Sequence, residues 1–278
     1  MKKRLEIKTE FVTYIEALTE TAAPNDDYDE HVHHDELEIY SFVEGELYFS
    51  FEGDRIKVND GDVIIISSGS LHRTVIRTPC RYFRKRLLIK NNFFASMPTG
   101  ALELQNRLTQ KGIIVFNREK LADSSLDGVL AEIENSIKKR TAYDDFCAMT
   151  ALASFLIEAE RAGGEREKRR TLFGHRAEDI VRYIDKNISS PLDYNSIASE
   201  FHISTKNLYK IFKSETGFTL SKYIRIRRII KAKTLLNSGA SPSQAAEKAG
   251  FSDYSVFYRC FTEELGIPPS KYAAKQKN

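Results

Sequence analysis

Three histidines and one glutamate early in the chain have the residue types and the spacing of a ligand-binding cluster. They are His31, His33, Glu38 and His72. His31 and His33 are two residues apart, so a β-strand would project both imidazoles to the same face. Imidazole and carboxylate groups coordinate divalent metal ions, and the same groups hydrogen-bond to small polar molecules. A metal site, an effector site and a structural polar network without a ligand are all compatible with this pattern.

The elements that must position these side chains are predicted to be β-strands. Apolar and β-branched residues gather in short runs over the first hundred residues, and turns rich in Gly, Asn and Asp separate the runs. The predicted strands are residues 32–43, 47–51, 55–58, 63–66, 73–76 and 82–89. Short strands at this spacing are typical of a small antiparallel barrel or sandwich. Closure of the barrel would bring Glu38 and His72 towards the histidine pair.

From about residue 123 the apolar residues recur with the period of a helix. Leu126, Leu130, Ile133 and Ile137 share one face of a first predicted helix. A second helix carries a similar stripe, made of Phe146, Met149, Leu152, Phe155, Leu156 and Ala159. The pair is predicted either to close under the barrel or to present a seam to a second copy of the chain. Two glycines and a charge run then predict a linker at residues 163–174.

The formal net charge of +3 conceals a division between two parts of the chain. Residues 175–278 carry 17 Lys and Arg against 10 Asp and Glu, a net charge of +7. Residues 1–174 carry 25 against 29, a net charge of −4. A basic carboxy-terminal third indicates an anionic partner at that end of the chain.

Composition argues against several classes of protein. Hydrophobic residues make up 41% of the 278 residues, enough to form folded cores rather than a disordered chain. No apolar run approaches the roughly 20 residues that a membrane-spanning helix needs, and no apolar segment follows the basic start as in a secretory signal. The cysteines, Cys80, Cys147 and Cys260, form no metal-ligand pattern, so we expect a reduced, cytoplasmic protein.

The basic third contains the same pair of helices twice. Asp193 and Ser204 are predicted to cap two helices joined by a tight turn, and about fifty residues later Ser241 and Asp253 begin a second pair. This arrangement is the helix-turn-helix frame, whose second helix lies in the major groove of DNA. In the first frame, His202 holds the turn position that often carries Gly, which predicts a left-handed backbone conformation there. A basic helix, residues 221–237, joins the two frames.

Residues 175–275 resemble the DNA-binding domain of the AraC family of transcriptional regulators. The resemblance rests on the segments LYKIFKSETG at residues 208–217, AGFSD with FYRCF within residues 249–261, and GIPPSKY at residues 266–272. It implies sequence-specific binding to double-stranded DNA by a homodimer, with RNA polymerase as a further candidate partner. Whether the output is activation or repression does not follow from it.

Helix geometry and the resemblance together select the side chains expected to meet DNA. The predicted base readers are Lys206, Asn207, Tyr209, Lys210, Tyr254, Ser255, Tyr258 and Arg259. The predicted phosphate contacts are Thr205, Lys213, Arg227, Arg228 and Lys231. Arg259 is the leading candidate for reading guanine, because an arginine can donate two hydrogen bonds to O6 and N7 of that base.

Two shorter motifs resemble those of the cupin barrel. The first contains the histidine pair and Glu38, and the second runs from residue 61 to His72, with Ser67 where cupins usually have proline. In metal-binding cupins the matching positions supply three histidines and one glutamate. The resemblance therefore implies His31, His33, Glu38 and His72 as ligands of an effector or of a divalent metal. No cofactor is required by this interpretation.

The sequence thus predicts an α+β multidomain protein. Residues 1–120 would form a cupin-like antiparallel β-barrel that binds the effector, 121–162 a helical connector that dimerises, 163–174 a linker, and 175–278 an all-α tandem helix-turn-helix domain. The predicted function is a sequence-specific transcriptional regulator, not an enzyme, controlled by a small molecule such as a sugar or related metabolite. The alternative is a metal-dependent cupin enzyme with an appended DNA-binding domain.

Overall fold

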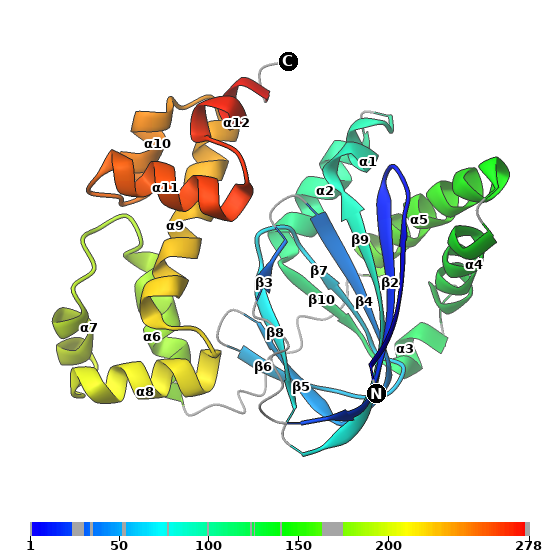
Figure 1. Cartoon of the computed structure of the whole chain (residues 1–278), viewed down its shortest axis with the longest axis horizontal. Coiled ribbons are helices and arrows are strands. Elements are labelled where there is room, and N and C mark those ends of the chain that lie inside the picture. Colours follow the sequence, from blue (N-terminus) through cyan, green and yellow to red (C-terminus); the bar gives the residue numbers. More distant parts are fainter. Residues whose placement is uncertain are drawn as a thin grey trace. The chain divides into compact units, whose positions relative to one another are not determined.

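The structure is a computed structural model that describes residues 2–23, 31–33, 36–51, 54–76, 78–98, 100–122, 124, 126–139, 141–162 and 175–275. The described residues form two compact units, here called the amino-terminal unit (up to residue 162) and the carboxy-terminal unit (from residue 175). Figure 1 shows that the first is built on β-sheets and the second on helices. This mixture confirms the predicted α+β fold class.

Two antiparallel sheets form the frame of the amino-terminal unit. The larger sheet has the order β1 (Lys2–Lys8), β2 (Val12–Ala22), β9 (Cys80–Lys90), β4 (Glu36–Glu44), β7 (Val63–Ile66) and β10 (Ile113–Phe116). The smaller has the order β3 (His31–Val32), β8 (Leu71–Ile76), β5 (Leu47–Phe51) and β6 (Asp54–Val58). Phe42, Ile64 and Tyr82 of the larger sheet share one core with Phe49 and Val58 of the smaller, so the two sheets pack face to face.

Helices cover the other face of the larger sheet. They are α1 (Asn91–Ala95), α2 (Gly100–Lys111), α3 (Arg118–Ala122), α4 (Leu126–Lys139) and α5 (Ala142–Ala162). Leu87 and Ile89 of β9 share a core with Ile133 of α4 and Phe155 of α5. Figure 1 shows α4 and α5 beside the larger sheet. Since side chains alternate along a strand, β9 presents apolar residues to these helices and its other face to the smaller sheet.

The apolar stripe of α4 is buried inside the amino-terminal unit. Leu126, Leu130, Ile133 and Ile137 all belong to the core beneath the larger sheet, as predicted for helices that close under the barrel. On α5 the predicted stripe is buried from Leu152 onwards, but Phe146 departs from it, with 66% of its surface exposed. Phe146 points away from the core because it lies near the start of α5, on the opposite side of that helix from the buried residues.

The predicted β-rich segment contains more elements than the sequence pattern suggested. The predicted strand at residues 32–43 is divided between β3 and β4, and the strands β1, β2 and β10 and the helices α1 to α3 were not predicted. Strand β1 is an edge strand that is mostly exposed, so its charged residues lack the alternation that marks a half-buried strand.

The carboxy-terminal unit is entirely helical in its described part. Its helices are α6 (His175–Lys186), α7 (Tyr194–Glu200), α8 (Thr205–Thr216), α9 (Leu220–Asn237), α10 (Pro242–Lys248), α11 (Tyr254–Leu265) and α12 (Pro269–Lys275). The predicted N-caps are confirmed: the side chains of Asp193, Ser204, Ser241 and Asp253 each accept a hydrogen bond from the backbone N–H three residues on. Pairs α7–α8 and α10–α11 therefore form the two predicted frames. No helix in the described part of the chain is long and apolar enough to cross a membrane.

Candidate functional site

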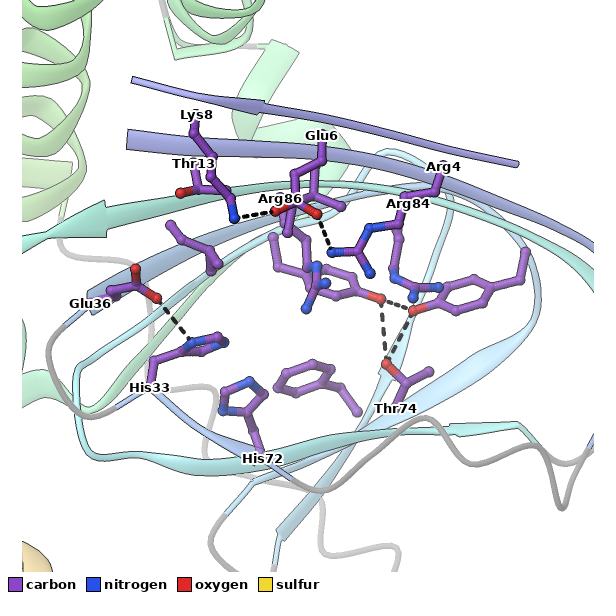
Figure 2. Close-up of a pocket in the computed structure, with 15 residues that line it drawn as sticks. Arg4, Glu6, Lys8, Thr13, His33, Glu36, His72, Thr74, Arg84 and Arg86 are labelled. Carbon is purple, nitrogen blue, oxygen red and sulfur yellow. Dashed lines mark hydrogen bonds and ion pairs between the residues drawn. The ribbon is translucent and has the colours of Figure 1, made fainter. Parts of the chain in front are cut away.

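A cavity of about 570 Å³ lies in the amino-terminal unit between the two sheets. Its lining combines charged, aromatic and hydroxyl-bearing side chains. The residues that line it are Arg4, Glu6, Lys8, Thr13, Ile15, His33, Glu36, Tyr40, Phe49, His72, Thr74, Tyr82, Arg84, Arg86 and Leu88. Figure 2 shows the residues of β1 and β9 on one side and His33, His72 and Thr74 on the other. The predicted cluster thus lies at the wall of a cavity large enough for a metabolite.

The structure brings three of the four predicted cluster residues together. Nε2 of His33 lies 3.2 Å from Oε2 of Glu38, and Nε2 of His72 lies 3.0 Å from the same oxygen. Glu38 is only 1% exposed, so its carboxylate is removed from solvent. The backbone of His31 pairs in register with that of His72, while the side chain of His31 lies outside what the structure describes.

Neighbouring groups hold both imidazole rings in place. Nδ1 of His72 donates a hydrogen bond to the carbonyl oxygen of Ser70 at 3.0 Å, because a carbonyl can only accept. The ring of His72 stacks between those of Phe49 and His33, with centroids 5.5 and 5.6 Å away. Nδ1 of His33 lies 3.4 Å from a carboxylate oxygen of Glu36. These contacts direct the two Nε2 atoms towards Glu38.

The cluster shifts the protonation equilibria of its own members. Burial alone would lower the pKa of His33, but the carboxylates of Glu36 and Glu38 outweigh it and raise the pKa to about 9. Burial alone would raise the pKa of Glu38, but the two imidazoles hold that pKa well below its usual range. The carboxylate is therefore ionised and His33 is protonated at neutral pH.

The same three residues have the donor set of a divalent metal site. Their ligand atoms all lie within 4.8 Å of one another, and histidine and carboxylate are common ligands of transition metals. The hydrogen bond from His72 to Ser70 is the outer contact that a metal-bound histidine usually makes. One neighbour opposes a cation, because Nη1 of Arg86 lies 3.6 Å from Oε1, the other carboxylate oxygen of Glu38. His33, Glu38 and His72 thus fit a metal, in competition with a guanidinium.

Four basic residues of the cavity were missed by the sequence analysis. Arg84 and Arg86 come from β9, and Arg4 and Lys8 come from the edge strand β1. A signal for the first two existed, because Tyr82, Arg84 and Arg86 alternate along a predicted strand and must share one face. No comparable signal marked β1, which was not predicted to be a strand.

A group of hydroxyls adjoins the basic residues. The hydroxyls of Tyr40 and Tyr82 are hydrogen-bonded to each other, and the hydroxyl of Thr74 lies 3.1 Å from that of Tyr82. Burial holds the pKa of Tyr40 well above its usual range, so this phenol stays protonated. The guanidinium of Arg84 lies 4.6 Å from the centre of the Tyr82 ring. The cavity can therefore hydrogen-bond to a polar ligand and pack against its carbon skeleton.

The predicted base readers all lie on the solvent-exposed faces of α8 and α11. They are Lys206, Asn207, Tyr209, Lys210, Tyr254, Ser255, Tyr258 and Arg259. Leu208 and Phe212 of α8 and Phe257 and Phe261 of α11 point inward and are completely buried. Each second helix of a frame thus has one apolar face in the core and one polar face free for a partner.

The predicted phosphate contacts divide into two groups. Lys213 is exposed, whereas Nε of Arg227 forms an ion pair with Asp185 at 2.9 Å. Arg228 donates hydrogen bonds to the carbonyl oxygens of Ile188 and Ser190. Arg227 thus joins α9 to α6, and Arg228 joins α9 to the loop after α6. Both side chains have partners within the unit. Thr205 and Lys231 also donate hydrogen bonds within the unit, each to one side chain, Asn195 and Ser189 respectively.

Comparison with known families matches two segments of the chain. A helix-turn-helix domain matches residues 197–275, and a cupin domain matches residues 18–87. Two solved structures are similar at low identity. ToxT from Vibrio cholerae with a bound unsaturated fatty acid is 19% identical over 97% of both chains, with a TM-score of 0.41. The DNA-binding domain of AdpA in complex with a target DNA is 22% identical over 36% of this chain and 92% of that domain, with a TM-score of 0.35.

Curated relatives match the carboxy-terminal unit. The HTH-type transcriptional activator RhaR of Cronobacter sakazakii is 32% identical over 32% of each chain, and the uncharacterized regulator YfiF of Bacillus subtilis is 34% identical over 36% of this chain and 32% of YfiF. The match thus spans about a third of these two relatives. The multiple antibiotic resistance protein MarA of Escherichia coli is 33% identical over 34% of this chain and 74% of MarA. With a relative matched over most of its length and both expected domains found, the chain belongs to the AraC family of transcriptional regulators and carries an amino-terminal cupin domain.

Proposed function

We propose that the chain binds specific DNA sequences through the carboxy-terminal unit and that a small molecule in the cavity of the amino-terminal unit controls this binding. The observation that carries the proposal is the pair of equivalent frames, α7–α8 and α10–α11, whose second helices both expose polar residues. A helix-turn-helix frame places its second helix in a major groove. Two such helices in one unit would read successive grooves.

The experiment that tests DNA recognition is selection of duplexes from a random pool, followed by hydroxyl-radical footprinting on the selected sequence. We expect protection of two major-groove segments about one helical turn, or 34 Å, apart for each chain. A footprint confined to a single groove, or no enrichment of any sequence, would contradict the tandem interpretation. Because its partner is DNA, we also propose that the protein acts in the cytoplasm, with RNA polymerase as a further partner.

The cavity supports the control by an effector. A ligand shifts a protein between two states only by as much as its affinity for those states differs. We propose that occupation of the cavity changes the orientation or freedom of the carboxy-terminal unit and thereby the affinity for an operator. A metabolite screen by thermal shift, followed by DNA-binding measurements with each hit, tests this. Hits that stabilise the chain but never change its DNA affinity would contradict the control.

We also propose that the chain forms a homodimer through the exposed face of α5. Tyr143, Thr150 and Ile157 recur every seven residues on this face, and Phe146 lies between the first two, which is the spacing of a helix–helix seam. Tyr143 is 84% exposed.

We further propose that the chain is divided into an effector-binding domain up to residue 120, a connector up to 162, a linker up to 174 and the DNA-binding domain after it. The core shared by α4, α5 and the larger sheet makes the connector a structural part of the amino-terminal unit.

The competing function is a metal-dependent cupin enzyme with an attached DNA-binding domain. The observation in its favour is the convergence of His33, Glu38 and His72. Elemental analysis of the purified chain and of a His72→Ala variant tests the metal. About one transition-metal ion per chain, lost in the variant, would support this function. A metal-free chain that still binds DNA selectively would remove it.

A further inference from the structure

We propose that the effector is a small organic anion whose carboxylate or phosphate group lies against Arg84 and Arg86 in the cavity of the amino-terminal unit. This inference rests on the proposed control by a small molecule. It narrows the expected class of ligand from sugars and related metabolites in general to those that carry a negative charge.

The charge of the cavity wall is the first argument. Arg4, Lys8, Arg84 and Arg86 line the cavity, whereas the acidic residues in the lining are Glu6 and Glu36. Glu6 lies at the rim and forms ion pairs with two basic residues of its own strand, Arg4 at 2.6 Å and Lys8 at 3.1 Å. Glu36 lies against His33. Both acidic residues of the lining thus lie beside basic side chains, Glu6 beside Arg4 and Lys8 and Glu36 beside His33.

The depth of Arg86 is the second argument. Its side chain is 13% exposed, and its Nε has no hydrogen-bond partner among the described residues. The carboxylate of Glu38 is shared with His33 and His72, and its distance of 3.6 Å from Arg86 exceeds that of a hydrogen bond. A buried N–H of a guanidinium that lacks a hydrogen bond is costly, because the lost hydration is not replaced. An anionic ligand would supply the missing acceptors.

The alternation of side chains along β9 is the third argument. Tyr82, Arg84, Arg86 and Leu88 all line the cavity, whereas Lys85 pairs with Glu134 of α4 at 2.6 Å on the opposite face. Figure 2 shows Arg84 and Arg86 among the side chains that surround the cavity. Each guanidinium group is planar and presents a fork of N–H donors, which suits the paired oxygens of a carboxylate or phosphate.

The other residues that line the cavity indicate the chemistry of the uncharged part of the ligand. The ring of Phe49 and the hydroxyls of Tyr40, Thr74 and Tyr82 line the cavity together with the two arginines. These groups can pack against a carbon skeleton and hydrogen-bond to its hydroxyls. A hydroxylated acid or a sugar phosphate satisfies both parts of the wall. A neutral sugar would fill the same volume and could accept hydrogen bonds through its hydroxyls, but it would bring no negative charge to Arg84 and Arg86.

The experiment measures the melting temperature of the full chain with sulfate, inorganic phosphate, glucuronate, glucose 6-phosphate and neutral glucose, each at matched ionic strength in sodium chloride. We expect at least one anion to raise the melting temperature, by about 5–10 °C at 100 times its dissociation constant, and glucose to have no effect. Glucuronate and glucose 6-phosphate distinguish a carboxylate from a phosphate ligand. No rise with any anion would overturn the proposal.

Two variants separate this site from the general effect of salts on stability. In Arg84→Met/Arg86→Met the anion-dependent rise should fall at least tenfold, whereas the general stabilisation by sulfate should remain. The matched control is Lys85→Met, which removes a positive charge from the same strand on the face away from the cavity and should respond like the wild type. An unchanged rise in the double variant would overturn the proposal. If the double variant does not fold, Arg84→Gln alone is measured, and its rise must fall at least threefold.

DNA binding by the same samples distinguishes the two proposals. An anion that stabilises the wild type but leaves its affinity for a selected duplex unchanged would support the anion site and contradict control by the effector. The second outcome is that no tested anion raises the melting temperature or alters DNA binding, while the chain still selects a DNA sequence. It would contradict the anion site but not the proposed DNA recognition.

Discussion

His202 and Gly250 occupy the same position in the two helix-turn-helix frames, and both have a positive φ, 52° for His202 and 94° for Gly250. Each follows the C-cap of the first helix of its frame. The next residue in each case donates a backbone hydrogen bond of 3.0 Å back into that helix, from Ile203 to Ala198 and from Phe251 to Ala246. The turn geometry is therefore the same in both frames, although only one of them uses glycine.

This equivalence predicts opposite outcomes for two exchanges. His202→Gly removes a left-handed conformation that costs about 1–2 kcal/mol in a non-glycine residue, against about 0.5–1 kcal/mol for the greater freedom of glycine in the unfolded chain. We expect a net stabilisation of about 0.5 kcal/mol by this balance. Urea unfolding of the full chain, followed by the helical circular dichroism signal, measures it.

The partner exchange, Gly250→Ala, should destabilise the chain. A Cβ atom at Gly250 would lie 2.5 Å from the carbonyl oxygen of Ile188 and 2.9 Å from Cα of Ser189, so the backbone must shift. Strain and overpacking together should cost about 2–4 kcal/mol in the same urea experiment. A Gly250→Ala variant as stable as the wild type would show that the turn lacks the geometry described.

Glu38 should be essential to the stability of the amino-terminal unit. Glu38→Gln removes the buried carboxylate that lies beside His33, His72 and Arg86, and leaves the protonated His33 with Glu36 as its remaining acidic neighbour. Breaking a buried ion pair in this way typically costs about 3–5 kcal/mol, which urea unfolding can measure. The matched control is Glu44→Gln on the same strand, whose ion pair with Arg81 is exposed and should be worth at most about 1 kcal/mol.

Arg259 and Lys213 should differ in how they affect DNA binding. Arg259→Ala should lose about 1–3 kcal/mol on the selected duplex and relax the preference at one base pair. Lys213→Ala should weaken binding to selected and random duplexes alike and reduce the slope of affinity against salt. Fluorescence anisotropy at several salt concentrations measures both. Equal losses on both duplexes for Arg259→Ala would rule out base reading by this side chain.

The two faces of the connector helices should separate folding from dimerisation. Ile133 is completely buried in the core beneath the larger sheet, so Ile133→Ala should cost about 2–5 kcal/mol of stability. Phe146→Asp should instead leave stability almost unchanged and dissociate the dimer, because Phe146 is exposed on α5. Analytical ultracentrifugation and urea unfolding give the two readouts. A dimer that survives Phe146→Asp would exclude this face as the interface.

Local patterns allowed much of the carboxy-terminal unit to be predicted from the sequence. The N-cap hydrogen bonds of Asp193, Ser204 and Asp253 join atoms three residues apart, so the residue types suffice to predict them. The turn at His202 was likewise predictable, because a helix-turn-helix frame requires a positive φ there. The cluster of His33, Glu38 and His72 was found because its residues match a known motif, not because the chain showed that they meet.

The tertiary structure alone decided which distant segments share a surface. The edge strand β1 lies two strands away from β9 in the larger sheet, with β2 between them, and this order brings the rim pair of Arg4 and Glu6 to the same cavity as Arg86. Arg227 meets Asp185 from 42 residues away, an ion pair that no pattern around Arg227 indicated. Strand order and helix packing depend on burial summed over the whole unit. The residue pattern of one segment therefore does not predict which distant segment packs against it.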